Sequence, residues 1–165
     1  MKKFSAILFS LLFLIQGSLW AYSSNPKDFV NELVNDTIKT LSDKNLSKEQ
    51  KKEFVEKLAL ENIDISALGL YTLGELRKSS KENEISRYKV SFEKYFLKNI
   101  TSRLLDYSSS EFKILGEDKK SVNYTIISSK VEPTDGGPEI KIDWRVYTKN
   151  PDKPLIRDLI VEGLS

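Results

Sequence analysis

The side chains of this protein that could carry out acid–base or metal chemistry are carboxylates. The sequence contains no histidine and no cysteine. It therefore holds no Ser-His-Asp or Cys-His arrangement and no imidazole to act as a general acid or base. Most zinc sites are excluded as well, because histidine and cysteine are their usual ligands. What remains is carboxylate chemistry or ligand binding, and we expect neither a metal nor a cofactor.

The most unusual stretch of the chain, residues 63–77, is apolar on most of its surface. Its apolar side chains at near-helical spacing are Ile65, Leu68, Tyr71, Leu73 and Leu76. Gly69 and Gly74 would each cost about 1 kcal/mol relative to alanine inside a helix, so they are expected to allow a close approach or a bend. The stretch is either a buried core helix or the wall of an apolar ligand pocket.

Residues 1–21 have the features of a cleavable signal peptide. Two lysines precede an apolar run from Phe4 to Ile15, and the small residues Gly17, Ser18 and Ala21 follow it. We expect cleavage after Ala21 and an exported protein. The alternative is an uncleaved membrane anchor, but the apolar run is short for about 30 Å of hydrocarbon.

Residues 22–165 suit a single domain with one hydrophobic core. The leader carries two lysines and no acid, so the 26 basic and 24 acidic residues of the whole chain become 24 of each. A nucleic-acid-binding surface would need a clustered positive excess, so nucleic acid is not an expected partner. Without cysteine, an exported domain has to be held together by its core.

Helices are expected in the first two-thirds of the exported chain. The first is amphipathic, begins near Pro26, and repeats apolar residues at three- and four-residue steps up to Leu41. Ser47 and Gln50 form a capping-box pattern that opens the second helix.

The apolar stretch supplies the third helix, with Asp64 or Ser66 as its cap and its end expected at Gly74 or at Ser79-Ser80. A fourth, long helix is expected from about Lys81 to Asp106. It carries a stripe of phenylalanine and tyrosine, for which core packing is the usual explanation.

The apolar pattern then changes from a helical period to alternation, which indicates strands. The first strand is expected to begin at Phe112, with a turn over residues 117–121 before the second strand. Turn signals follow at residues 133–138 and 150–154, and residues 140–147 alternate strictly between apolar and polar side chains.

Strands joined by short turns are antiparallel neighbours, and the last one is expected at residues 155–162. This order predicts an α+β fold in which N-terminal helices pack on a curved antiparallel sheet of about four strands. If the curvature is strong, the concave face of the sheet and the helices enclose a cavity suited to a ligand.

Two short patterns, one in the middle of the chain and one at its end, carry a family resemblance. Together they resemble the MlaC family, the periplasmic phospholipid-binding proteins of the Mla lipid-transport system of Gram-negative bacteria. The residues that stand in the family's positions are Asp64, Leu73, Gly74, Arg77, Asp158, Glu162, Gly163 and Ser165. The signal peptide and the aromatic long helix fit the same family, and the resemblance covers most of residues 26–165.

The resemblance implies an NTF2-like cone with a deep apolar pocket for acyl chains. It also implies a periplasmic carrier that moves phospholipid between an outer-membrane lipoprotein complex and an inner-membrane ABC transporter with an MCE-domain subunit, with a role in outer-membrane lipid asymmetry. Such a carrier needs no catalytic group, and we expect a monomer.

The sequence departs from the family pattern in three ways. Leu76 stands where the family usually has tryptophan, and Pro154 where it has an aromatic residue. Family members also usually continue for another helix or two beyond the final motif. Residues 22–165 are therefore expected to be a C-terminally truncated lipid-binding domain, with a pocket incomplete on one side.

The predicted pocket residues are apolar, because removing acyl chains from water is worth about 0.8 kcal/mol per methylene. They are Ile65, Leu68, Tyr71, Leu73, Phe92, Tyr95, Phe96, Ile126, Ile142, Trp144 and Val146. For each of them, ordinary core packing is the alternative. The head group is expected at the mouth of the pocket, near Arg77, Arg103 or Arg145, for which the alternative is plain surface arginine.

Two other functions stay open. NTF2-like cones also host isomerases and dehydratases that use buried carboxylates, and the candidates here are Asp64, Asp143 and Asp158. Asp64 is better explained as a helix cap and Asp158 as a paired structural carboxylate. The other possibility is an envelope adaptor that binds only protein, which would carry no extractable lipid.

Overall fold

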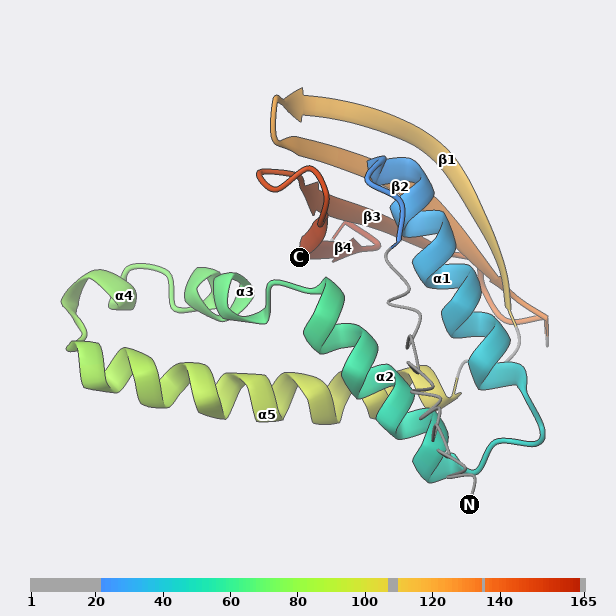
Figure 1. Cartoon of the computed structure of the whole chain (residues 1–165), viewed down its shortest axis with the longest axis horizontal. Coiled ribbons are helices and arrows are strands. Elements are labelled where there is room, and N and C mark those ends of the chain that lie inside the picture. Colours follow the sequence, from blue (N-terminus) through green and yellow to red (C-terminus); the bar gives the residue numbers. More distant parts are fainter. Residues whose placement is uncertain (1–21, 107–109, 135, 164–165) are drawn as a thin grey trace, which may run out of the picture.

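The computed structural model describes residues 22–106, 110–134 and 136–163, so the expected signal peptide lies outside the described residues. Helices come first and an antiparallel sheet follows, which confirms the predicted α+β class (Figure 1). The elements are α1 (Pro26–Ser42), α2 (Lys48–Asn62), α3 (Ile65–Thr72), α4 (Leu76–Ser79), α5 (Glu82–Asp106), β1 (Ser110–Ser121), β2 (Tyr124–Pro133), β3 (Ile140–Tyr147) and β4 (Leu155–Val161).

The first two helices begin where their capping residues predict. In α1, Pro26 occupies the first turn and the Asn25 side chain accepts hydrogen bonds from the next two free backbone N–H groups. In α2, the Ser47 hydroxyl accepts from the Gln50 backbone N–H at 3.2 Å, and the Gln50 side chain accepts from the Ser47 N–H at 2.8 Å. This reciprocal pair is the predicted capping box, and such caps are worth about 1 kcal/mol.

The apolar stretch forms two helices instead of one. The Asp64 carboxylate caps α3 by accepting from the Ala67 N–H at 3.0 Å. Gly74, just beyond α3, adopts a φ of +54°, a left-handed conformation that interrupts a right-handed helix. The single turn of α4 follows, and α5 then runs back along α3. Figure 1 shows α3, α4 and the first half of α5 extending beyond the sheet, and we call this part the helical arm.

The sheet has the order β1-β2-β3-β4, with antiparallel neighbours throughout. The predicted turn over residues 117–121 is wrong, because β1 stays paired to β2 as far as Ser121 opposite Tyr124. The turn lies at residues 122–123 instead. Every residue from 115 to 123 is exposed, so neither face of this part of β1 is dry and no apolar alternation marks it as a strand. A register shift between Ile114 and Gly116 also breaks the alternation.

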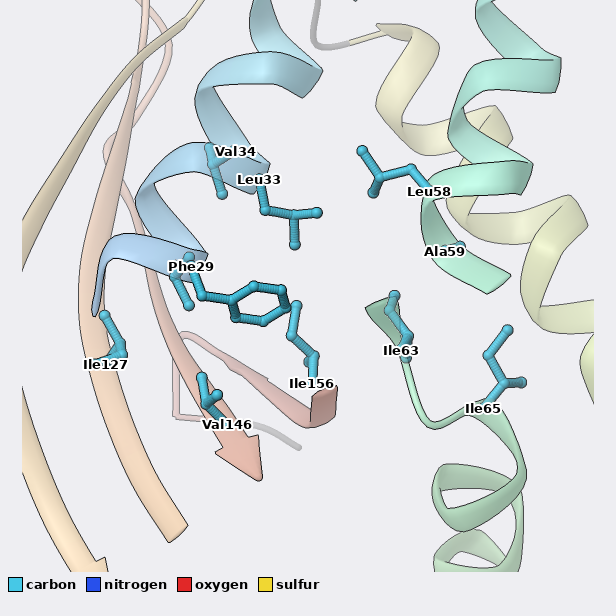
Figure 2. Close-up of a cluster of buried hydrophobic side chains, with 11 residues drawn as sticks. Phe29, Leu33, Val34, Leu58, Ala59, Ile63, Ile65, Ile127, Val146 and Ile156 are labelled. Carbon is cyan, nitrogen blue, oxygen red and sulfur yellow. The ribbon is translucent and has the colours of Figure 1, made fainter. Parts of the chain in front are cut away.

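The core forms where α1 lies against the concave face of the sheet and α2 closes the other side (Figure 2). In Figure 1 the sheet curves around α1. The buried cluster consists of Phe29, Val30, Leu33, Val34, Leu58, Ala59, Ile63, Ile65, Ile127, Val146 and Ile156. Within the described part of the chain, no helix combines the length and the apolar character needed to cross a membrane.

Candidate functional site

A set of apolar side chains packs against the buried cluster and stays partly exposed. We call this set the apolar border. Its members are Tyr22, Ile38, Phe54, Phe92, Phe96, Leu97, Ile100, Phe112, Ile114, Trp144 and Leu159. Large apolar side chains left partly in water beside a core are where an apolar ligand gains the most contact, since each methylene it buries contributes about 0.8 kcal/mol.

On the sheet, Trp144 is a member of the apolar border whose ring is held by specific contacts. Its indole N–H donates to the Ser129 hydroxyl at 2.8 Å, and that hydroxyl donates to the Ile142 carbonyl at 2.9 Å. Phe112 meets the indole edge to face, with the ring centroids 6.3 Å apart. Because the polar atom of Trp144 is satisfied within the sheet, the rest of the ring is an oriented apolar surface.

On α5, Phe92 and Phe96 are the aromatic members of the apolar border. Their rings stack with centroids 6.2 Å apart, and the Tyr88 ring lies 5.7 Å from that of Phe92. A Cβ atom at Gly69 would lie 2.8 Å from the Phe92 ring. Gly69 therefore allows α3 to pack directly on this ring, which agrees with the close approach expected from the sequence.

The predicted pocket residues fall into different environments. Phe92, Phe96 and Trp144 belong to the apolar border. Ile65 and Val146 lie inside the buried cluster, with 5% and 0% of their surfaces exposed, so protein atoms already cover them.

The other predicted pocket residues lie outside both sets. The half-buried ones are Leu68, Leu73, Ile126 and Ile142. Tyr71 and Tyr95 are exposed, at 61% and 66%. Ile126 pairs with Arg145, one position away from the pair formed by Ile127 and Trp144. Since successive residues of a strand point to opposite faces, Ile126 lies on the face of the sheet away from the buried cluster.

Several members of the apolar border were not among the predicted pocket residues. They include Leu97, Ile100, Phe112, Ile114 and Leu159. Phe112 and Ile114 alternate with polar residues in β1, so the sequence places them on one face. Whether this face points to the core depends on the pairing with β2, where Ile114 lies opposite Ser129. The local sequence pattern does not determine that pairing.

The three candidate head-group arginines also differ. Arg145 is committed to Asp158, with Nη1 3.0 Å from Oδ2 of a carboxylate whose side chain is only 8% exposed. Its place opposite Ile126 puts it on the far face of the sheet. Arg77 of α4 and Arg103 of α5 are exposed and form no ion pair with any residue that the structure describes.

Asp64 and Arg157 join the helical arm to β4. Both Nε and Nη2 of Arg157 lie 3.0 Å from Oδ2 of Asp64, and the guanidinium carbon sits 3.6 Å from the centroid of the Tyr147 ring. The Asp64 backbone N–H donates to the Ile156 carbonyl at 2.8 Å, beside an isolated parallel bridge between Ile63 and Ile156. We call this arrangement the Asp64 joint.

The final motif continues the same edge of the sheet. The Glu162 carboxylate accepts a hydrogen bond from the Lys141 N–H, and the Glu162 N–H donates to the Lys141 carbonyl at 3.0 Å. Glu162 and Gly163 have φ values of +50° and +80°, so the chain turns sharply here. Ser165 of the motif lies outside the described residues.

Two of the three carboxylates considered for catalysis, Asp64 and Asp158, serve structural contacts. Asp64 caps α3 and pairs with Arg157, and Asp158 pairs with Arg145. Across residues 22–106, 110–134 and 136–163, no group of three metal-binding side chains gathers. The titratable group with a strongly shifted pKa in the apolar border is Tyr22. Burial, followed by the charge and hydrogen bond of Asp36, raises its pKa to about 12.

Comparisons with known proteins show the fold and the family that this chain shares with them. A phospholipid-binding protein from Ralstonia solanacearum, solved in complex with a phospholipid, superposes with a TM-score of 0.67 at 16% sequence identity, over 84% of this chain and 78% of that chain. That likeness shows a shared fold. The comparison with curated proteins found no match. The profile of the MlaC protein family matches residues 31–165, which confirms the resemblance carried by the Asp64 and Asp158 patterns. The chain belongs to the MlaC family.

Proposed function

We propose that this protein is a periplasmic phospholipid carrier and that the acyl chains of the bound lipid lie along the apolar border. The observation that carries the proposal is the border itself: partly exposed aromatic and aliphatic side chains from both helices and sheet, all packed against one buried cluster. Membership of the MlaC family supports a binding or transport role over catalysis. A protein of the same fold was solved with phospholipid bound.

The energetics suit a carrier. Burying one acyl chain of roughly fifteen methylenes is worth up to about 12 kcal/mol relative to water. A lipid that leaves a bilayer gives up the same contacts, so the carrier has only to match the bilayer and not to exceed it. Side chains that stay partly exposed without ligand, such as Trp144 and Phe96, supply that contact and still allow release.

The head group of the lipid would remain near water. A phosphate pairs well with a guanidinium, which offers two parallel N–H groups in a planar fork. Of the three candidate arginines, Arg77 and Arg103 keep their guanidinium groups exposed, whereas Arg145 is engaged by Asp158. Arg77 and Arg103 are therefore the favoured head-group residues.

The family also supports a route for the lipid. The carrier would exchange phospholipid with an outer-membrane lipoprotein complex and with an inner-membrane ABC transporter that has an MCE-domain subunit. The signal peptide expected at residues 1–21 would bring it to the periplasm. No step of this exchange requires acid–base chemistry.

Mass spectrometry of lipid extracted from the protein tests the proposal. Mature protein purified from the periplasm without detergent is expected to carry phospholipid in near-stoichiometric amount. Phe96→Ser, which removes a ring of the apolar border, should lower the occupancy several-fold. Val122→Ser is the matched control, because Val122 lies at the β1–β2 turn and is 84% exposed. A cooperatively folded sample without any lipid would contradict the proposal and favour an adaptor that binds only protein.

A further inference from the structure

The positive charge of the chain is concentrated on the helical arm and α5. Residues 76–103 contain eight basic and three acidic side chains, a formal excess of five positive charges. Residues 22–165 as a whole contain 24 of each kind, so the remainder carries an equal negative excess. A protein with no net charge thus presents one strongly basic element, which directs that element toward an anionic surface.

Within α5, three of the basic side chains share one face. Arg87, Lys94 and Lys98 are separated by seven and four residues, a spacing that stacks them along one side of a helix. All three are exposed, and none forms a hydrogen bond or ion pair with a described residue. The rings of Phe92 and Phe96 occupy the other side, against α3 and the buried cluster.

Exposed apolar side chains lie among these cations. Val90 is 58% exposed and Tyr95 is 66% exposed. Val90 lies three residues after Arg87, and Tyr95 directly follows Lys94. Aromatic and aliphatic side chains interleaved with lysine and arginine are typical of a helix that lies in a membrane interface, where the apolar groups enter the acyl boundary and the cations meet the head groups. A purely solvated helix face would not need them.

The surroundings leave this face open. In Figure 1, α5 runs along an edge of the molecule, with α3 and α4 on the side toward the sheet. A depression of about 370 Å³ opens on the same face and is lined by Glu84, Arg87, Tyr88 and Ser91. The Glu84 carboxylate there already accepts a hydrogen bond from the Lys81 backbone N–H at 2.8 Å. We define the docking face as Arg87, Val90, Lys94, Tyr95 and Lys98.

We propose that the docking face binds the surface of an anionic phospholipid bilayer. An acidic protein is the alternative partner, but stable protein interfaces centre on a contiguous apolar cluster that excludes water. On the docking face the apolar side chains are single and separated by cations, which favours a lipid surface. This inference goes beyond the carrier function, because a docked protein need not have taken up a lipid.

Vesicle flotation tests the docking face. The mature protein should float with vesicles that mix phosphatidylglycerol and phosphatidylcholine, and should stay unbound with phosphatidylcholine alone. Added salt should weaken the binding, because it screens charges at an exposed surface. Each lysine or arginine near an anionic bilayer strengthens binding by about fivefold, so the triple substitution R87Q/K94Q/K98Q should weaken it by about a hundredfold.

The matched control is K44Q/K149Q/K153Q, which removes the same charge from three exposed lysines outside α5 and should keep most of the binding. Tyr95→Ser should weaken vesicle binding without altering its salt dependence. Equal loss in the control and the docking-face variant would overturn the proposal, as would failure of the unaltered protein to float with anionic vesicles. Lipid extracted from R87Q/K94Q/K98Q should remain at the unaltered level, so docking and carriage can fail independently.

Discussion

Gly69 shows how much of the arrangement depends on single residues. The ring of Phe92 lies where a side chain at position 69 would begin, so α3 packs on α5 only because this residue has no Cβ atom. Phe92 in turn belongs to the apolar border. A contact between two helices therefore also sets the position of a side chain in the candidate lipid site.

Gly69→Ala is expected to destabilise the protein although alanine is the better helix former. The gain in helix propensity is about 1 kcal/mol, whereas forcing a methyl group against the Phe92 ring costs about 1–3 kcal/mol. We expect a net loss of about 1 kcal/mol in the free energy of unfolding, measured by urea denaturation. Gly116→Ala is the control, since no heavy atom lies within 4 Å of its Cβ position. Equal effects at the two positions would show that packing at Gly69 is unimportant.

Tyr22 makes the stability of the fold sensitive to alkaline pH. Its pKa is raised to about 12 in the folded chain, first by burial and then by Asp36, whereas an unfolded tyrosine titrates near pH 10. The folded state therefore holds this proton more tightly, so the contribution of Tyr22 to stability is complete below about pH 10 and is lost as the pH rises toward 12.

Denaturation curves recorded between pH 8 and pH 12 check this expectation. Tyr22→Phe should remove part of the alkaline loss of stability, because phenylalanine has no proton to release. At pH 8 the substitution should lower the free energy of unfolding only by the modest contribution of the hydrogen bond from the Tyr22 hydroxyl to Asp36. An unchanged alkaline slope in the variant would show that Tyr22 does not titrate with unfolding.

Among the elements, the Asp64 joint positions the helical arm. One carboxylate caps α3 and pairs with Arg157 on β4, although the two residues are 93 positions apart. The neighbouring backbone pairs with Ile156 in the buried cluster. The direction in which α3, α4 and α5 leave the core is thus fixed at Asp64, one of the residues that carry the family resemblance.

Asp64→Ala should therefore cost about 2 kcal/mol of stability, through loss of the cap and of a half-buried charged hydrogen bond. Asp64→Asn should cost clearly less, because asparagine is a good N-cap and loses only the charge. Thermal unfolding of both variants and the unaltered protein measures the order. If asparagine proved as damaging as alanine, the cap would contribute nothing and the ion pair would account for the whole effect.

How far the sequence predicts each element depends on where its stabilising contacts lie. The boundaries of α1 and α2 follow from Asn25, Ser47 and Gln50, whose hydrogen bonds reach only a few residues along the chain. The second half of β1 has both faces exposed, so the length of the β1–β2 hairpin depends on cross-strand pairing and not on an apolar pattern in β1.

The sequence predicts that the candidate site is apolar, but it does not predict which residues belong to it. Apolar periodicity identifies Phe92, Phe96 and Trp144, which belong to the apolar border. It cannot tell them from Val146, which is fully covered, or from Tyr95, which faces water, because burial depends on which helices cross which strands. Ile126 shows the same limit, since a shift of one position in a strand moves a side chain to the other face.

At the scale of the whole molecule, the two proposals assign lipid carriage and membrane attachment to different parts of the chain. The sheet, α1, α2 and the start of α3 provide the buried cluster, and the apolar border around it is the proposed contact for acyl chains. The helical arm extends from the Asp64 joint beyond the sheet, with the docking face along α5 (Figure 1). This division predicts that lipid carriage depends on the border and that attachment to a bilayer depends on the docking face.

Fluorescence of Trp144 tests the central claim most directly. Trp20 lies in the expected signal peptide, so Trp144 is the one tryptophan in the sequence from 22 to 165. When the mature protein is loaded with phospholipid whose acyl chains carry bromine, contact with the chains should strongly quench Trp144, while the same lipid without bromine should not. In Trp144→Phe with Val122→Trp, the reporter at the β1–β2 turn should stay bright. Bound brominated lipid with unquenched Trp144 would contradict a site along the apolar border.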